Sequence, residues 1–240
     1  MLLEIKNGLD VTNYLGVLKW EPPASYGMGG SARGNFPSHL TPKTDQERVE
    51  NMKKAFHKIA QSGKTLTLEE TEKLEGMSCT ILKNEGDIHV CSRNVDLSDE
   101  EGNVYWEVAR SSGILDILSS DDIGNISIQG EIVGPKIQGN YYGLNDFQFY
   151  VYNIYDIDKR DYWDSDVRQA FTNAHNLKHV PVLGRIPFNS DVQFYIDRAN
   201  GAMSLINPEK MREGNVYKCV EDPSLSFKAI SREYLANQKD

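Results

Sequence analysis

The chain has 240 residues, 39% of them hydrophobic and 12 of them tyrosine, which is enough apolar material for one large domain with a sizeable core. It contains no run of 18 apolar residues, and Met1–Lys6 carries an acid and no long apolar core, so we expect a cytoplasmic or other intracellular protein with no membrane segment or signal peptide. The formal net charge of −9 argues against strong nonspecific binding of nucleic acid, although it leaves a specific site open.

The N-terminal residues 1–42 are rich in Gly, Pro and Ser around one apolar run, Val11 to Trp20. Residues 21–30, Glu-Pro-Pro-Ala-Ser-Tyr-Gly-Met-Gly-Gly, are expected to form a loop because of their turn chemistry. Such a segment cannot build a core by itself. We therefore expect it to pack on the rest of the chain as a strap.

A helix is expected directly after the strap. Thr44 or Asp45 has the chemistry of an N-cap, and four residues follow on helical spacing, namely Val49, Met52, Lys53 and Phe56. Ser62-Gly63 should end this helix. We therefore divide the chain into an N-terminal strap and helix, residues 1–60, packed on a main domain, residues 61–240.

The main domain begins with a change from helical to strand periodicity at Leu66. Strands are predicted over residues 66–74, 79–82, 88–92, 126–133, 147–157, 180–183, 215–220 and 225–230. Helices are predicted over residues 104–118 with a break at Gly113, over 164–175 with an acidic cap, and over 191–199 before Asn200-Gly201. Mostly antiparallel strands with helices inserted between them predict an α+β fold built on packed sheets.

The cysteines and histidines do not form a set of metal ligands. The three cysteines are odd in number and lack metal-binding spacing, so we expect free thiols in a reducing compartment. We interpret His57, His89, His175 and His179 as structural residues.

The strongest chemical candidate is Lys73, which opens the segment Lys-Leu-Glu-Gly-Met-Ser. A lysine amine attacks phosphorus only when it is unprotonated, so it needs a site that lowers its pKa. Gly76 lets the backbone come close to a ligand. Three later segments supply two carboxylates and a second cation: Gly-Glu131-Ile-Val-Gly-Pro, Arg-Glu213-Gly-Asn-Val and Ser-Phe-Lys228-Ala-Ile-Ser.

Lys73-Leu-Glu75-Gly76 resembles the nucleophile motif, Lys-x-Asp-Gly, of the covalent nucleotidyltransferase superfamily. This superfamily contains ATP-dependent DNA ligases, RNA ligases and mRNA capping enzymes. Five further segments match its motifs in the superfamily order: Ser92-Arg93-Asn94, residues 130–138, residues 149–154, residues 212–216 and Ser226-Phe-Lys228. The resemblance implies a domain like the ATP-grasp-like nucleotidyltransferase domain of DNA and RNA ligases.

Within the superfamily, Gly-Glu-x-x-Gly-Pro-x-Ile-Gln and Ser-Phe-Lys-Ala-Ile-Ser are most similar to nick-sealing RNA ligases. Gly34-Asn-Phe-Pro, followed by Pro42-Lys-Thr-Asp, resembles the branch with an oligonucleotide-binding (OB) module before the catalytic domain. The chain begins where that module would end. We therefore expect either a catalytic domain without its module or a naturally short enzyme.

The chain departs from the superfamily pattern at two positions. Glu75 replaces the usual aspartate after the nucleophile, which keeps the charge and lengthens the side chain by one carbon. Ser226 replaces the first lysine of the usual Lys-x-Lys in the last motif. Lys218 is the nearest basic candidate for the missing phosphate contact.

The resemblance also implies roles for the matching residues. Lys73 would be the nucleophile, and Glu72, Glu75 and Gly76 would border the bound nucleotide. Arg93 and Lys228 would balance phosphate charge, Glu131 would hold the ribose hydroxyls, and Glu213 would bind Mg²⁺ or Mn²⁺. Tyr152, with Phe149 in reserve, would stack on adenine; the two lie three apart on a strand, so at most one faces the ligand.

These roles predict an ATP-dependent RNA ligase that forms a lysyl-AMP at Lys73, transfers AMP to a 5′-phosphate and joins it to a 3′-hydroxyl. We expect a monomer that acts on nicked or broken RNA, including an RNA–DNA hybrid duplex. A DNA ligase and a capping guanylyltransferase are the alternatives within the superfamily. A catalytically inactive nucleic-acid-binding relative is a further alternative, against which the intact Lys73, Glu131, Glu213 and Lys228 argue.

Overall fold

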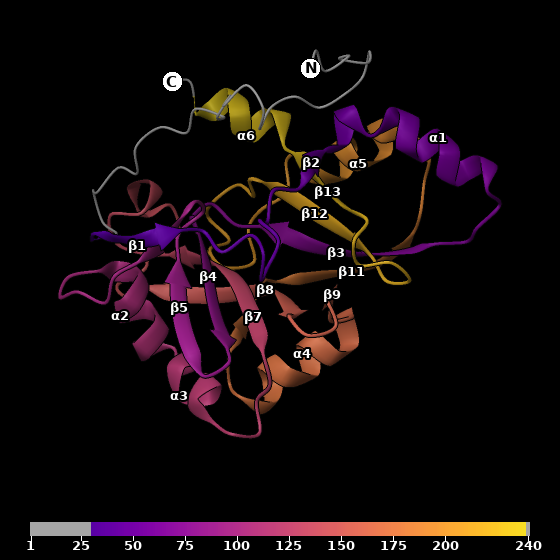
Figure 1. Ribbon diagram of the computed structural model, residues 1–240. Coiled ribbons are helices and arrows are strands. Elements are labelled where there is room, and N and C mark those ends of the chain that lie inside the picture. The colour runs from indigo at the N-terminus through magenta and orange to yellow at the C-terminus, as the bar shows by residue number, and fades with distance from the viewer. Residues whose placement is uncertain (1–29, 239–240) are drawn as a thin grey trace, which may run out of the picture.

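Two β-sheets face each other across the protein in the computed structural model, which describes residues 30–238 (Figure 1). The apolar run from Val11 to Trp20 lies outside the described residues, as does all but the last residue of the loop predicted over residues 21–30. No helix within residues 30–238 combines the length and the apolar character that a bilayer span requires.

The larger sheet, sheet A, has eight strands that are antiparallel except for the short parallel pair β8 and β10. The edge strand β9 pairs with β8. In spatial order the sheet contains β1 (Ala32–Asn35), β6 (Val95–Leu97), β5 (Asp87–Cys91), β4 (Met77–Asn84), β7 (Ile126–Val133), β8 (Gln148–Asp156) and β10 (Lys178–His179), with β9 (Asp161–Tyr162) off this path.

The smaller sheet, sheet B, has five strands, and only β2 and β13 are parallel. Its order is β11 (Val182–Pro187), β3 (Thr67–Lys73), β12 (Gly214–Cys219), β13 (Ser226–Ile230) and β2 (Glu47–Arg48). The chain leaves β3 in sheet B and enters β4 in sheet A within four residues. The end of β3 therefore lies at the junction of the two sheets.

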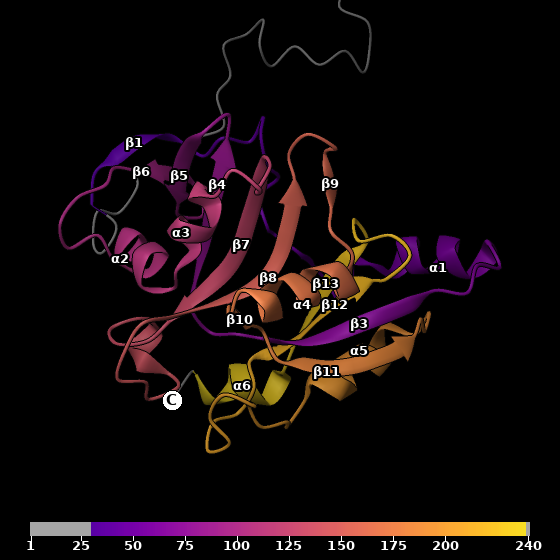
Figure 2. The same cartoon turned by 90° about the horizontal axis from the view of Figure 1, so that it is seen from below.

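Each sheet has an apolar core on its outer face. Helices α2 (Val104–Ser111) and α3 (Ile114–Ser119) pack on sheet A, whereas α1 (Lys53–Gln61) and α5 (Val192–Ala199) pack on sheet B. Figure 2 shows these two helix pairs at opposite ends of the molecule. Helices α4 (Ser165–Ala174) and α6 (Arg232–Asn237) complete the fold. Because the apolar residues of the strands face outward to these helices, the inner faces of the sheets are free to carry polar side chains.

The predicted α+β fold with mostly antiparallel sheets is confirmed. The strand over residues 126–133 has the predicted bounds, and the break at Gly113 separates α2 from α3. Asp164 and Asp191 cap α4 and α5, each accepting a backbone N–H from the first turn of its helix.

The start predicted for the first helix is wrong. Thr44 and Asp45 do not cap it, because residues 47–48 form β2, a 3-10 turn follows over Val49–Asn51, and α1 begins only at Lys53. Pairing of β2 with the distant β13 overrides the helical spacing of the local sequence. The strand predicted over residues 180–183 is also displaced, since β11 spans Val182–Pro187 to match its antiparallel partner β3.

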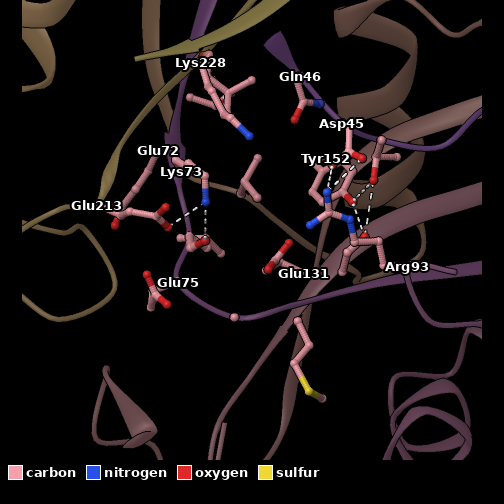
Figure 3. Close-up of a pocket in the computed structure, with 18 of the residues that line it drawn as sticks. Asp45, Gln46, Glu72, Lys73, Glu75, Arg93, Glu131, Tyr152, Glu213 and Lys228 are labelled. Atoms are coloured by element: carbon pink, nitrogen blue, oxygen red, sulfur yellow. Dashed lines mark hydrogen bonds and ion pairs between the residues drawn. The ribbon is translucent and has the colours of Figure 1, made fainter. Parts of the chain in front are cut away.

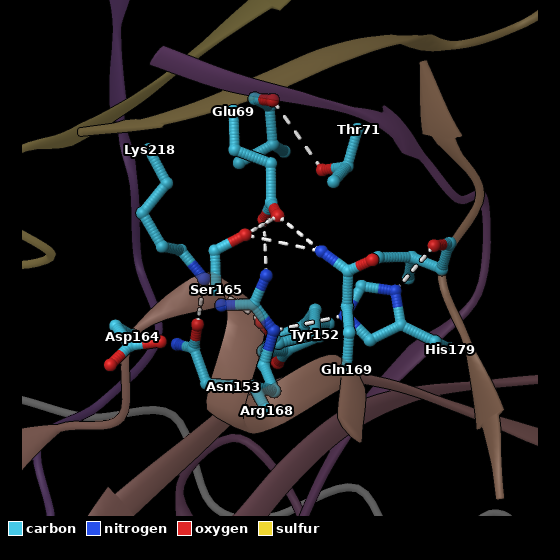
Figure 4. Close-up of polar contacts among 12 residues, drawn as sticks. Glu69, Thr71, Tyr152, Asn153, Asp164, Ser165, Arg168, Gln169, His179 and Lys218 are labelled. Atoms are coloured by element: carbon cyan, nitrogen blue, oxygen red, sulfur yellow. Dashed lines mark hydrogen bonds and ion pairs between the residues drawn. The ribbon is translucent and has the colours of Figure 1, made fainter. Parts of the chain in front are cut away.

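A buried ionic cluster joins sheet B to α4 (Figure 4). The Arg168 guanidinium, 1% exposed, donates to the Glu69 carboxylate and, through Nε, to His179 Nε2 at 2.9 Å. Burial opposes ionisation of Glu69, but Arg168 and the Ser165 hydroxyl keep the pKa of this carboxyl below its usual value. Burial, together with the neighbouring Arg168 charge, lowers the pKa of His179 to about 4, so its ring is a neutral acceptor at pH 7.

We predict that Arg168→Met destabilises the protein by about 3–5 kcal/mol, because it leaves the buried Glu69 carboxylate unpaired. Arg110→Met is the matched control, since it removes a guanidinium paired with Asp99 where both side chains are 49% exposed. The control should cost less than about 1 kcal/mol. Urea unfolding of both variants measures the difference, and equal losses of unfolding free energy would contradict the structural role of the cluster.

Candidate active site

A pocket of about 410 Å³ lies between the inner faces of the two sheets (Figure 3). Sheet B contributes Lys73, Val216 and Lys228, and sheet A contributes Glu131 and Tyr152. Most of the residues predicted from the sequence therefore converge here, although they come from segments spread over the whole main domain.

Lys73 is the last residue of β3, and its side chain points into the pocket. Its Nζ donates to Glu213 Oε2 at 2.6 Å, while the two side chains are 24% and 13% exposed. The strand opposite Lys73 carries Gly214, where a Cβ would lie 2.1 Å from the carbonyl oxygen of Ala229. Only glycine allows this approach of β12 and β13, which places Glu213 beside the lysine.

Two carboxylates of the pocket hold their protons more strongly than usual. Burial raises the pKa of Glu131 to about 8 against the opposing charge of Lys73, and Glu213 and Glu75 add to the rise. Burial also raises the pKa of Glu213 to about 7, although Lys73 opposes this shift. The pocket therefore combines buried carboxyl groups of raised pKa with the amine of Lys73.

Gly76 and Glu75 form the turn between β3 and β4. A Cβ on Gly76 would lie 2.4 Å from the carbonyl oxygen of Ile132 and 2.8 Å from Glu131 Cγ, so glycine allows β7 to bring Glu131 to the pocket. The Glu75 carboxylate accepts a hydrogen bond from the Tyr234 hydroxyl of α6. The longer side chain at this position is thus held by the C-terminal helix.

The two further cations lie on opposite walls. Arg93, 65% exposed, pairs with Asp45 at 2.8 Å at the rim of the pocket. Lys228 lies on β13, and its side chain makes no hydrogen bond or ion pair with the described residues. Burial and the nearby Lys73 lower the pKa of Lys228. Both cations are available to an anionic ligand. Lys228 can bind it without breaking an ion pair, whereas Arg93 would give up its exposed ion pair with Asp45.

Of the two aromatic candidates, only Tyr152 lines the pocket. Its hydroxyl donates to Thr44 Oγ1 at 3.0 Å and lies 3.1 Å from Ser78 Oγ. Phe149, 4% exposed, belongs instead to the core between sheet A and its helices, where its ring covers Gly130. Phe149 therefore does not contact the pocket, and we correct its place among the candidate ligand-binding residues.

Glu72 borders the pocket, but its side chain faces the other way. Glu72 and Lys73 are neighbours on a strand, so they point to opposite faces of sheet B. The Glu72 carboxylate is 1% exposed and accepts the backbone N–H of Leu205 at 2.8 Å. The Glu72 side chain therefore makes a structural contact on the face of sheet B opposite to that of Lys73. Burial raises the pKa of its carboxyl group.

Lys218 lies directly across β12 and β13 from Ser226 and lines the pocket. Its buried amine donates to the carbonyl oxygen of Tyr152 at 2.8 Å and to the Asn153 side chain. The amine therefore ties sheet B to sheet A. Burial and the neighbouring Arg168 charge lower the pKa of Lys218, so it is a poorer phosphate partner than Lys228.

Sequence reasoning missed the segment Thr44-Asp45-Gln46, which closes one side of the pocket. Local spacing favours a helix start there, whereas the folded chain uses the segment to cross from sheet A to sheet B before β2. Tyr142, whose hydroxyl oxygen accepts the Glu75 N–H at 2.8 Å, was also missed. The only sequence signal was the Tyr141-Tyr142 pair after the third motif, and it does not identify its partner.

Among residues 30–238, no group of three or more His, Cys, Asp or Glu side chains is arranged as a ready metal site. Glu213 and Glu131 nevertheless place carboxylates in one pocket with raised pKa values. Mg²⁺ commonly uses one or two carboxylates together with water and substrate phosphates. The donor set fits a divalent ion that arrives with a phosphorylated ligand.

The comparisons with known proteins agree with this geometry. The sequence model of the RNA ligase family matches residues 66–230. Naegleria gruberi RNA ligase, solved as an apo point mutant, is 38% identical with a TM-score of 0.82 over 98% of this chain and 68% of that chain. The same ligase with PPi is also 38% identical, with a TM-score of 0.82 over 98% and 68% of the two chains. A mutant with AMP and Mn is 38% identical, with a TM-score of 0.81 over 99% and 69%.

No curated protein sequence matches the chain. The α+β fold is that of the nucleotidyltransferase domain of an RNA ligase. The chain belongs to the RNA ligase family.

The raised pKa of Glu131 predicts a pH-dependent gain of stability in Glu131→Gln. The folded protein holds a proton up to about pH 8 that the unfolded chain releases near 4.5, so ionisation of Glu131 destabilises the fold as pH rises between these values. Glutamine cannot ionise. The variant should melt at nearly the wild-type temperature at about pH 5 and roughly 4 °C or more above it at about pH 8.5.

Thermal unfolding at the two pH values measures this effect. Glu107→Gln, at an exposed position on α2, is the control and should follow the wild type at both. A melting temperature of Glu131→Gln that does not rise relative to wild type between the two pH values would contradict the buried, crowded environment of Glu131.

Proposed function

We propose that this protein is an ATP-dependent RNA ligase that uses Lys73 as its nucleophile. The observation that carries the proposal is the Lys73 amine, held 2.6 Å from Glu213 in a pocket that Glu131 and Lys228 also line. The membership in the RNA ligase family and the solved complexes of the Naegleria gruberi ligase with AMP and Mn and with PPi support it.

In the first step, Lys73 Nζ attacks the α-phosphorus of ATP, a nitrogen–phosphorus bond forms, and pyrophosphate leaves. The amine must first give up a proton, and Glu213 is hydrogen-bonded to it and has a pKa of about 7. Lys228 lines the same pocket, and its own pKa is lowered by burial and by the nearby Lys73. Lys228 and Arg93 would hold the phosphates in position for in-line displacement.

The next two steps return the lysine to its starting state. The 5′-phosphate of an RNA strand attacks the lysyl-AMP phosphorus, which breaks the nitrogen–phosphorus bond and gives an RNA strand capped by AMP through a diphosphate. The 3′-hydroxyl of the adjoining strand then attacks the 5′-phosphorus, a phosphodiester forms, and AMP leaves. Tyr152 would stack on adenine and Glu131 would hold the ribose hydroxyls through these steps.

A divalent ion, Mg²⁺ or Mn²⁺, would neutralise the phosphate charge that builds up during the displacement. Glu213 would hold it, because its carboxylate lines the pocket beside Lys73. Ionised Glu213 would then be shared between the ion and Lys73.

The finer assignments belong to the same proposal. We assign residues 61–240 to the nucleotidyltransferase domain and residues 1–60 to a segment packed on it, which adds β1 to sheet A and β2 to sheet B. The substrate would be nicked or broken RNA, including an RNA–DNA hybrid, and the enzyme a monomer. The three cysteines are free and buried, which fits a reducing, intracellular compartment.

The experiment is incubation with ATP labelled at the α-phosphate and Mn²⁺, followed by a denaturing gel. The wild type should carry label, and Lys73→Arg should carry none, because the arginine guanidinium stays protonated. Lys159→Ala, at an exposed turn lysine, should label like the wild type. Label that persists on Lys73→Arg would refute the nucleophile, and preferential labelling by GTP would point to a capping enzyme.

A further inference from the structure

The surface of α1, on the outer side of sheet B, carries positive charge that the proposed chemistry does not use. The exposed residues of α1 include Lys53, Lys54, His57 and Lys58, and the helix contains no acidic residue. This is unusual in a chain with 35 acidic and 26 basic residues. None of these lysines forms an ion pair or hydrogen bond with any residue in the described part of the chain.

The charges of α1 are placed where they destabilise the helix by itself. Lys53 and Lys54 occupy its first turn, at the positive end of the helix dipole, and no acid accompanies them there. Lys54 and Lys58 are four residues apart, so two like charges face each other on one side of the helix. Each effect is unfavourable to the isolated helix, and a bound polyanion would reverse the sign of both.

The surface is continuous with the pocket. Arg48 of β2 is the register partner of Lys228, and its exposed side chain makes no ion pair with the described residues. The chain passes from Arg48 through one 3-10 turn into α1, which runs outward along the end of the molecule (Figures 1 and 2). Cations therefore extend from the wall of the pocket to the outer end of α1.

The acids near this surface form no ion pair with its lysines. Glu47 accepts hydrogen bonds from the Asn51 amide at 2.5 Å and from the backbone N–H of Arg48. Asp191 lies beside Lys53 and His57, but it caps α5 by accepting the Gln193 N–H at 2.9 Å. Glu50 is exposed on the 3-10 turn and precedes the helix. The lysines of α1 remain open to an external partner.

We propose that α1, with Arg48, is the surface on which the phosphate backbone of a duplex RNA substrate docks beside the pocket. The inference rests on the proposed ligase function and adds where the substrate lies. Lys54 and Lys58 are separated by roughly 6 Å along the helix axis, a spacing comparable with that of successive phosphates on one strand. Contacts of this kind carry affinity without reading sequence.

The test uses the full chain, a fluorescent nicked RNA duplex and binding measured by anisotropy over a series of salt concentrations. The double variant Lys54→Gln, Lys58→Gln should weaken RNA binding roughly tenfold at low salt. It should also reduce the slope of log affinity against log salt concentration by about 1 for each phosphate that it no longer neutralises. The matched control is Lys159→Gln with Lys178→Gln, which removes the same charge from exposed positions on sheet A. The control should keep both the wild-type affinity and the wild-type slope.

Labelling by ATP separates this inference from the proposed function, because formation of lysyl-AMP needs no RNA. Both double variants should label like the wild type, which also shows that they are folded. If they label normally and the α1 variant binds RNA with unchanged affinity and slope, the α1 surface is refuted and the ligase function stands. Equal weakening by the two double variants, or no binding of the nicked duplex by the wild type, would also overturn the inference. No label on the wild type would refute the function itself.

Discussion

The site depends on the ion pair between Lys73 and Glu213, whose atoms are 2.6 Å apart where β3 ends and β12 begins. One ammonium stabilises a pocket in which Glu131 and Glu213 are both crowded and buried enough to have raised pKa values. In the proposed mechanism the Lys73 amine gives up a proton before it attacks, and Glu213, hydrogen-bonded to it, is the carboxylate placed to accept that proton.

The architecture makes such a polar interior possible. Each sheet buries its apolar residues against its own helices, so the inner faces need not form a hydrophobic interface. They are joined instead by hydrogen bonds such as those of Lys218 to β8 and of Tyr152 to Thr44. A third, smaller apolar cluster of Leu74, Val133, Tyr142 and Val180 lies beside the pocket, so apolar contacts as well as hydrogen bonds join the two sheets around the space for a ligand.

The sequence predicted the α+β fold, and most of the site residues that it singled out line one pocket. Periodicity of two located β7, and the spacing of glycine beside charged residues located Lys73, Glu131 and Glu213. The prediction from local sequence was wrong where non-local strand pairing decides the structure. Thr44 and Asp45 were predicted to cap a helix, but because β2 pairs with β13 they line the pocket instead. Periodicity restricted Phe149 and Tyr152 to opposite faces, and only the packing of Phe149 on Gly130 decided between them.

Peptide mapping by mass spectrometry, after incubation of the wild type with ATP and Mn²⁺, tests the central claim most directly. The account predicts a single AMP on the peptide that contains Lys73, joined through an acid-labile nitrogen–phosphorus bond. AMP found instead on Lys228, whose amine also lines the pocket, would contradict it. A protein that binds ATP and carries no covalent AMP would contradict it as well.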